Sequence, residues 1–303
     1  MNNTPGAGGS HPSVHLPVML SEVLALLAAQ PGQVIVDGTV GAGGHSREII
    51  KRIGETGRLI AIDRDPMMLD IARSVLPQEN CEFRQGSYAN LPDDLADLGI
   101  EKVDAILLDL GFSSDQLEDA SRGFRFDSSG PLDLRFDTAF GEPAWQYLQN
   151  VSEEELADVL WKYGEERFSR EIAASLIRLR ESQHSMTATE VVDAVLHAVP
   201  AKFQHEARRH SATRVFQALR IAVNRELEQL EISLTKSFPS VLKPGGRLVV
   251  ISFHSLEDRM VKTAFRDREH WQCLTPKPLT ATPAETRMNP RSRSAKIRGA
   301  IKL

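Results

Sequence analysis

The stretch from Gln33 to Ser46, QVIVDGTVGAGGHS, decides how the rest of the chain is interpreted. An apolar run ends at Asp37 and passes into a glycine-rich turn, and a helical stretch opens near His45. In such a turn the backbone can approach a ligand closely, and the helix N-terminus offers unpaired N–H groups to a carboxylate or a phosphate. The stretch therefore predicts a buried strand with a ligand site at its carboxyl end.

Four further strands are predicted after this stretch. Asp65 followed by Pro66 predicts the start of a helix, because a capping residue before a proline in the first turn is typical of helix N-termini. Strands and helices alternate, which is typical of a parallel, doubly wound α/β sheet. The additional predicted strands are Arg58–Asp63, Cys81–Arg84, Val103–Leu108 and Arg247–Phe253.

The alternation stops in the middle of the chain. Residues 111–137 form a long stretch without periodicity, and such loops are usually functional or disordered. From Ser152 to about Val199 the pattern is helical only, with capping boxes beginning at Ser152 and Thr187. A long helix begins near Ser211, with one apolar stripe made of Phe216, Leu219, Val223, Leu227, Leu230 and Leu234.

We therefore expect an α/β domain interrupted by an α-helical insert. The expected boundaries are a disordered leader at residues 1–14, the α/β domain at residues 15–115 and 213–303, and the inserted helical substrate-recognition domain at residues 116–212. A chain of 303 residues is long enough for one large domain or two unequal ones.

Composition excludes several classes of protein. With 36 basic and 41 acidic residues, the chain is not a uniformly basic nucleic-acid-coating protein, although local basic patches remain compatible with it. Two distant cysteines make neither a disulfide framework nor a cysteine-rich zinc site, and no His/Glu spacing of the zinc type occurs, so no metal is expected. The sequence lacks a signal peptide and a membrane-length apolar run, which predicts a cytoplasmic protein without a membrane partner.

The glycine-rich turn favours S-adenosylmethionine over a dinucleotide. Asp63 lies 22 residues after Gly41, a spacing at which an acidic side chain reaches ribose hydroxyls. The third glycine of the dinucleotide fingerprint is replaced by Ser46, so a cofactor with a ribose and a carboxylate but no phosphate fits better. A purely structural turn is the alternative. Tyr88 falls where the adenine would lie and either stacks on it or belongs to the core.

Asp109 is the candidate for holding the methyl acceptor. The strand before it delivers this carboxylate to the edge of the sheet where α/β folds bind ligands. Methyl transfer needs alignment and an available lone pair. If the acceptor is the exocyclic amine of a base, Asp109 can hold an N–H and turn the nitrogen toward the methyl group, while Phe112 stacks on the base. A capping role for Asp109 is the alternative.

Eight motifs, in order along about His15 to Leu303, resemble the RsmH (MraW) family of bacterial small-subunit rRNA methyltransferases. The motifs are DGTVGAGGHS at 37–46, IDRDP at 62–66, LLDLG at 107–111, RGF at 122–124, GPLD at 130–133, YGEER at 163–167, ATRVFQA at 212–218 and SFHSLEDR at 252–259.

The resemblance implies a Rossmann-like, class I S-adenosylmethionine-dependent methyltransferase domain interrupted by a helical domain. It also implies N4-methylation of a cytidine in the decoding region of 16S rRNA. The cofactor residues that it implies are Gly43, Gly44, His45, Asp63, Tyr88, Asp109 and Gln116, to which the glycine turn adds Gly41. The chain departs from the family at Asp115, where a proline is usual, and at Leu134 and Phe136, where methionines are usual. The missing proline frees the loop around Gln116.

Two basic segments and one polar stripe are the candidates for RNA binding. Lys202–Arg225 holds six basic residues and one acid, and Thr286–Leu303 holds six basic residues and no acid. They neutralise phosphates, or they are a solvated helix face and a disordered tail. Thr213 begins a polar stripe that we expect to line the acceptor cleft, and His254 is expected to line the site or to cap a helix. The predicted RNA contacts are Arg214, Gln217, Arg220, Asn224 and His254.

The aromatic residues of the 111–137 loop either stack on nucleotides or form a small satellite core. These residues are Phe124, Phe126 and Phe136.

Other functions remain open at this point. They are methylation of a small molecule or a protein, nicotinamide-dependent oxidoreduction on the same sheet, and RNA binding without catalysis. The basic tail and the long insert disfavour the first, and Ser46 disfavours the second. The sequence does not determine the oligomeric state.

Overall fold

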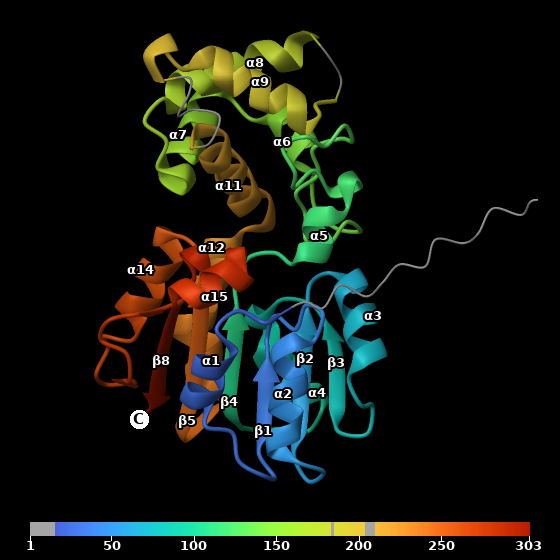
Figure 1. The fold of residues 1–303 in the computed structure, drawn as a ribbon, viewed down its shortest axis with the longest axis vertical. Coiled ribbons are helices and arrows are strands. Elements are labelled where there is room, and N and C mark those ends of the chain that lie inside the picture. The colour runs from blue at the N-terminus through green and yellow to red at the C-terminus, as the bar shows by residue number, and fades with distance from the viewer. Residues whose placement is uncertain (1–15, 183–184, 204–209) are drawn as a thin grey trace, which may run out of the picture.

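In the computed structural model, which describes residues 16–182, 185–203 and 210–303, eight strands form one sheet in the order β3-β2-β1-β4-β5-β8-β6, with β7 paired to β8 (Figure 1). Neighbouring strands from β3 to β5 are parallel, and β8 is antiparallel to both β5 and β6. The doubly wound α/β fold is therefore confirmed. The strands are Val34–Asp37 (β1), Arg58–Asp63 (β2), Cys81–Gln85 (β3), Val103–Asp109 (β4), Leu242–Ser252 (β5), Trp271–Cys273 (β6), Leu279–Thr280 (β7) and Lys296–Lys302 (β8).

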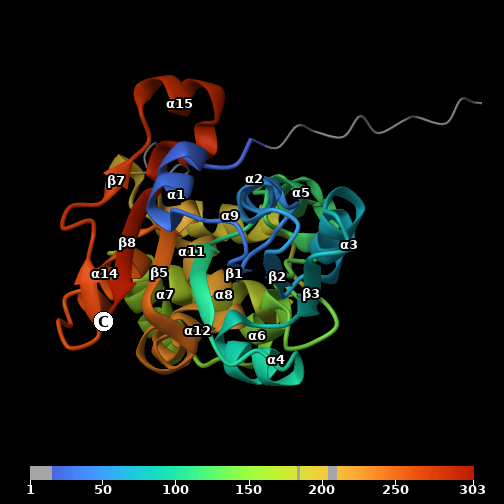
Figure 2. The same ribbon diagram turned by 90° about the horizontal axis from the view of Figure 1, so that it is seen from below.

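Helices cover both faces of the sheet (Figure 2). Side chains alternate along each strand, so Ile35 packs under one helical layer and its neighbour Val36 packs under the other. One layer contains Leu20–Leu27 (α1), Gly44–Ile53 (α2) and Pro66–Val75 (α3). The other contains Leu91–Asp97 (α4), Glu226–Ile232 (α12), Phe238–Val241 (α13) and Ser255–Ala264 (α14). Burial on both faces explains why the central strands β1, β2 and β4 are largely apolar runs in the sequence.

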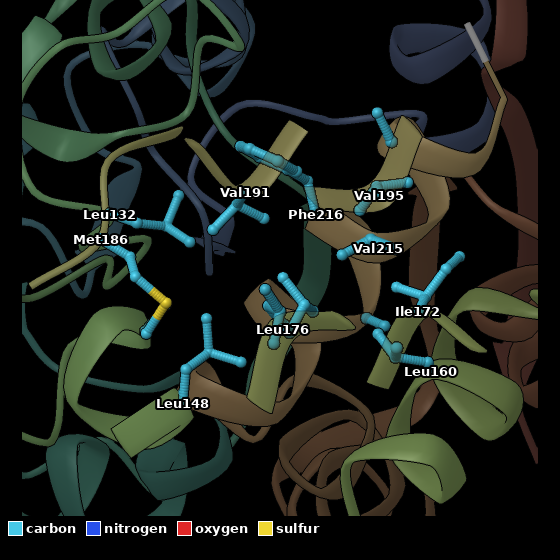
Figure 3. Close-up of a cluster of buried hydrophobic side chains, with 14 of the residues drawn as sticks. Leu132, Leu148, Leu160, Ile172, Leu176, Met186, Val191, Val195, Val215 and Phe216 are labelled. Carbon is cyan, nitrogen blue, oxygen red and sulfur yellow. The ribbon is translucent and has the colours of Figure 1, made fainter. Parts of the chain in front are cut away.

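The predicted helical insert forms a separate layer beyond the carboxyl ends of the strands (Figure 1). Its apolar core gathers leucine, isoleucine and valine side chains from several helices around Phe216 (Figure 3). Both predicted capping boxes are present, with Ser152 and Thr187 as the capping residues. The helices are Ala144–Asn150 (α6), Glu153–Gly164 (α7), Ser169–Ser182 (α8), Ala188–Ala198 (α9) and Ser211–Asn224 (α11).

The prediction of one long helix after Ser211 is wrong. The helix ends at Asn224, because Arg225 adopts a left-handed conformation with φ of 52°, and α12 begins at the next residue. The apolar stripe is therefore divided between two cores: Phe216 packs in the insert, whereas Leu230 packs against the sheet. Periodicity could not show this break, since both helices continue the same apolar spacing.

The same break changes where the chain returns from the insert. The prediction placed this return at residues 212/213, but the buried residues of α11, such as Val215 and Leu219, belong to the insert core. We propose that Arg225 marks the return to the α/β domain. The predicted leader, residues 1–14, lies outside the described residues, as does the part of the Lys202–Arg225 basic segment between residues 204 and 209.

The C-terminal basic segment is not a disordered tail, so that alternative is wrong. Its last part is β8, which lies between β5 and β6 in the sheet. Arg298 on this strand is buried and pairs with Asp258 at 2.7 Å between Nε and Oδ1. Ahead of the strand lie α15, Pro283–Met288, and a short 3₁₀ helix, Pro290–Ser294.

The 111–137 loop is ordered by a short helix and by stacked aromatic rings. Ser113 and Gln116 form a capping box for α5, Ser114–Glu118, which the sequence analysis did not anticipate. Phe124 stacks on Phe112 and Phe136, with centroid distances of 5.1 and 6.3 Å. The satellite-core alternative is thus the arrangement present here, and it joins the insert core.

Asn224 ties the insert to the α/β domain. Its side-chain amide donates to the carbonyls of Leu134 and Arg220, and its oxygen accepts from the backbone of Phe136. Arg64, directly after β2, donates to the carbonyl of Asn224 at 2.7 Å. The side chain is 2% exposed, and all of these bonds are internal. The structure therefore gives this predicted RNA contact a structural role.

Replacing Asn224 with alanine should destabilise the fold. The substitution leaves buried backbone groups of Leu134 and Phe136 unsatisfied, so we expect a loss of about 2 kcal/mol in the free energy of unfolding. Chemical denaturation of wild type and Asn224→Ala measures this loss. Asn90→Ala is the matched control, since the exposed Asn90 side chain does not cap α4, and it should change stability by less than about 0.5 kcal/mol. Unchanged stability in Asn224→Ala would contradict the structural role.

Candidate functional site

A cavity opens at the carboxyl ends of β1, β2 and β4, where a doubly wound sheet binds its ligands. It is closed on one side by the loop after β4 and on another by the start of α12. Its wall contains the turn after β1, the ends of β2 and β4, and the C-terminal segment. Residues lining this cofactor cavity include Gly38, Thr39, Gly41, Ala42, Gly44, His45, Asp63, Tyr88, Asp109, Phe112, Gln116, Glu226, Glu257 and Arg291.

Asp63 stands at the end of β2 and is held by backbone N–H groups. Its two carboxylate oxygens accept hydrogen bonds from Gly41 and Asp65, both at 2.9 Å. Burial raises the pKa of Asp63 to about 6, although the two N–H donors counteract the shift. Each oxygen still has a further lone pair, so the fixed carboxylate can also accept hydrogen bonds from a pair of ribose hydroxyls.

The three predicted glycines of the turn have different roles. Gly41 lines the cavity with φ of 50°, and a side chain there would meet only the carbonyl of Thr39 at 4.0 Å, so the backbone is open to a ligand. Gly44 also lines the cavity, against Pro17. Gly43 is not among the lining residues; its φ of 79° is left-handed, and an added Cβ would lie 3.2 Å from Leu76.

Asp109 lines the cavity and has one buried oxygen without a hydrogen-bond partner among the described residues. This oxygen is Oδ1, and Oδ2 lies 3.7 Å from Nδ1 of His45. His45 in turn contacts the carbonyl of Val18 through Nε2 at 2.9 Å. Burial raises the pKa of Asp109 to about 7, Arg291 opposes the shift, and Glu257 adds to it. A ligand that brings a positive charge or an N–H to Oδ1 would satisfy this carboxylate.

Tyr88 and Gln116 line the cavity but also belong to the protein framework. Tyr88 is buried between the sheet and the helical layer that contains α4 and α13, where its ring lies 6.3 Å from that of Phe238. The core alternative is therefore the arrangement present, and the contact with adenine stays a prediction that the position of Tyr88 in the cavity wall allows. Gln116 accepts from the backbone of Ser113 and donates to Asp65 at 2.7 Å, so its amide fixes the loop.

A second cavity, of about 680 Å³, adjoins the first. The two share Leu110, Gly111, Phe112 and Arg291, so the loop after β4 is their common wall. The predicted polar stripe reaches the second cavity in part: its lining contains Thr213, Gln217 and Arg220, together with His254. Arg214 is half-exposed, 3.7 Å from Glu166, and neither it nor Asn224 is among the lining residues.

His254 caps a helix and joins a buried cluster of charged groups. Its Nδ1 accepts from the backbone of Glu257, which confirms the predicted capping role, and its Nε2 lies 3.1 Å from Oε1 of Glu257. Glu226 lies close enough to both for the three to hold a metal ion, a juxtaposition that sequence spacing did not show. Both oxygens of Glu226, however, accept from Arg220, at 2.8 and 2.9 Å. The expectation that no metal is required stays a prediction.

Two arginines of the site were not identified from the sequence. Arg291 donates to the carbonyl of Phe112 at 2.6 Å and to the hydroxyl of Ser114 at 3.0 Å, so the C-terminal segment holds the wall between the cavities. Arg122, from the 111–137 loop, forms a buried ion pair with Asp65 at 2.9 Å. In the sequence, Arg291 is only one of six basic residues in the C-terminal basic segment, and nothing indicates its partners. Arg122 belongs to the RGF motif, which does not indicate that it pairs with Asp65.

The residues present fit S-adenosylmethionine. An open glycine turn beside a fixed carboxylate matches an adenosine ribose, and the unsatisfied Oδ1 of Asp109 suits the ammonium group of a methionine moiety. A parallel sheet with this strand order and an antiparallel strand between β5 and β6 defines, together with this site, a class I S-adenosylmethionine-dependent methyltransferase.

The chain belongs to the MraW methylase family, whose model matches residues 12–303, and S-adenosylmethionine is accordingly its cofactor. It is 44% identical to the "Ribosomal RNA small subunit methyltransferase H" of Trichlorobacter lovleyi, over 95% of this chain and 98% of that protein. Proteins of the same name from Sorangium cellulosum and Rhodopirellula baltica are each 46% identical, and each match covers 95% of this chain and 91% of the relative. Among the described residues, no helix is long and apolar enough to cross a membrane.

The charge on Asp109 should make cofactor binding pH-dependent. Because burial raises its pKa to about 7, Asp109 is increasingly protonated below pH 7, and the affinity for S-adenosylmethionine should fall there. Asp109→Asn should bind S-adenosylmethionine about 10- to 100-fold more weakly than wild type at pH 8, because one charge-assisted hydrogen bond is lost. The affinity of this variant should change little between pH 6 and 8. Calorimetric titration across this range tests both expectations. Equal pH profiles for the two proteins would contradict them.

Stability provides the control for this substitution. A carboxyl group whose pKa is raised in the folded state stabilises the fold at low pH, and this contribution is lost as the pH rises through about 7. Asp109→Asn should therefore unfold at a higher temperature than wild type at pH 8, and the difference should become small near pH 4. A variant that binds more weakly while folding more stably has not simply lost its structure.

Proposed function

We propose that this protein transfers a methyl group from S-adenosylmethionine to the N4 amine of a cytidine in the decoding region of 16S rRNA. The observation that carries the proposal is that the two cavities adjoin at Leu110, Gly111 and Phe112, so a cofactor in the first and a base in the second would both lie against these residues. The names of the similar proteins and the family resemblance support small-subunit rRNA as the substrate.

S-adenosylmethionine supplies an electrophilic methyl group next to the site where the acceptor must be placed. Asp63 holds the ribose hydroxyls, and Tyr88 forms the wall beside the adenine. Asp109 lines the first cavity next to the residues that both cavities share. Its Oδ1 suits the ammonium group of the cofactor, so Oδ2 would accept an N–H of the cytidine amine and turn the nitrogen lone pair toward the methyl carbon. As the nitrogen–carbon bond forms, the carbon–sulfur bond would break with release of S-adenosylhomocysteine, and the amine would lose one proton to solvent. Phe112 packs against the base, and the geometry supplies most of the catalysis through alignment.

The RNA partner is held around the second cavity. Gln217 and Arg220 of α11 line this cavity together with His254. Arg214, also on α11, is a half-exposed cation. Asn224 is omitted from the proposed RNA contacts because its amide is consumed by internal hydrogen bonds. The substrate is 16S rRNA, either free or assembled into the small ribosomal subunit.

Nicotinamide-dependent oxidoreduction is disfavoured because Ser46 stands where a dinucleotide site needs its third glycine. The hydroxyl of Ser46 donates to Asp37 at 2.7 Å, and both side chains are buried. This hydrogen bond fixes the start of α2 against the end of β1, where the glycine of a dinucleotide site allows close packing around a pyrophosphate.

Labelled S-adenosylmethionine should transfer its methyl group to small-subunit rRNA, and nucleoside analysis should identify N4-methylcytidine. Phe112→Ala should lower kcat/KM for RNA about 10- to 100-fold, because stacking on a base contributes about 1–3 kcal/mol. The matched control is Phe140→Ala, since Phe140 is 73% exposed and its loss should leave the rate unchanged. Label in another nucleoside, or none in RNA while the cofactor binds, would contradict the proposal.

A further inference from the structure

The second cavity has the chemistry of a site for one planar base. Its volume of about 680 Å³ lies within the range of small-ligand pockets. Five aromatic rings contribute to its wall, and eight of its seventeen lining residues are polar or charged. The aromatic residues are Phe112, Phe124, Phe126, Phe216 and Phe253. Such a wall holds any base by stacking, so selection among bases depends on the polar groups.

Arg220 is a rigid donor in this wall. Glu226 accepts from its Nε and Nη2 in a two-pronged contact, at 2.8 and 2.9 Å. The guanidinium carbon lies 5.2 Å from the ring centre of Phe112 and 6.0 Å from that of Phe136, so aromatic rings also confine the group. The residue is 8% exposed. A guanidinium fixed in this way loses little entropy when it binds a ligand.

One nitrogen of this guanidinium remains for a ligand. Glu226 takes Nε and Nη2, and Nη1 has no hydrogen-bond partner among the described residues. Three neighbouring donors are committed: Arg291 binds Phe112 and Ser114, the amide nitrogen of Gln217 binds the carbonyl of Tyr163, and Arg125 pairs with Asp127. Arg220 therefore offers this cavity a fixed N–H that can only donate.

We propose that Arg220 is the residue that selects cytosine over uracil in the second cavity, an inference that rests on the proposed function. Cytosine presents two acceptors, N3 and O2, next to its N4 amine, whereas uracil presents an N3–H donor and an O4 acceptor. An N–H of Nη1 of Arg220 donates to N3, which is an acceptor in cytosine and a donor in uracil, and N4 stays directed to the common wall. A uracil in the same pose brings its N3–H against the guanidinium and leaves donors unpaired, which sites of this kind reject strongly.

The test is competition between two short RNAs that carry the target sequence and differ only by cytidine or uridine at the methylated position. The ratio of their inhibition constants against rRNA methylation measures selectivity and does not depend on the active fraction of a variant. Wild type should prefer the cytidine RNA at least tenfold. Arg220→Met/Glu226→Gln removes the donor and leaves no unpaired buried carboxylate, and its ratio should fall to about one.

Two further variants make the result specific. Glu226→Gln alone retains the guanidinium and should keep most of the preference, whatever its effect on rate. Arg220→Lys keeps a positive charge beside Glu226 and loses the planar donor group, so its ratio should fall below that of Glu226→Gln.

The possible failures are distinguishable. If wild type forms N4-methylcytidine and the double variant keeps a tenfold preference, Arg220 has only a structural role and this inference is overturned. If wild type forms no N4-methylcytidine, the proposed function itself fails.

Discussion

The buried carboxylate of Asp65 is the constraint on which both cavities depend. It follows β2 by two residues and caps α3, where its Oδ1 accepts from the backbone of Met67 at 3.0 Å. Its Oδ2 accepts from Gln116 at 2.7 Å and from Arg122 at 2.9 Å. Removing one partner from such a pair leaves an uncompensated buried charge, which costs about 3–5 kcal/mol. One side chain thus anchors the loop after β4 to the strand that carries Asp63.

The anchored loop makes the common wall possible. Arg122 also donates to the carbonyls of Arg135 and Phe136 at 2.8 Å, and Arg291 holds the carbonyl of Phe112 from the opposite side. Asn224 of α11 bonds the backbone of Leu134 and Phe136, so the loop is fixed from the sheet, from the insert and from the C-terminal segment at once. Catalysis by alignment requires reacting atoms to be held within a fraction of an ångström, and a loop fixed from three elements provides such a wall.

The sequence predicted the parts of the fold that depend on local pattern. The buried strands, the glycine turn and the capping boxes at Ser152 and Thr187 each depend on residues close together in the chain. The break at Arg225 escaped prediction because apolar spacing continues across it. Pairings between distant residues, such as Arg291 with the Phe112 carbonyl, leave no local signal. Asn224 was interpreted as an RNA contact because a polar stripe on a helix resembles an exposed face until its partners are known.

The dependence of the cofactor cavity on the Asp65–Arg122 pair is tested most directly by a double-mutant cycle read out as S-adenosylmethionine affinity. We expect Asp65→Asn and Arg122→Met each to weaken binding about tenfold or more. The affinity of the double variant should be no lower than that of whichever single variant has the lower affinity. The two losses do not add because residues of one network couple by about 0.5–3 kcal/mol. Unchanged affinity in either single variant, or losses that add in the double variant, would show that the loop is held without this pair.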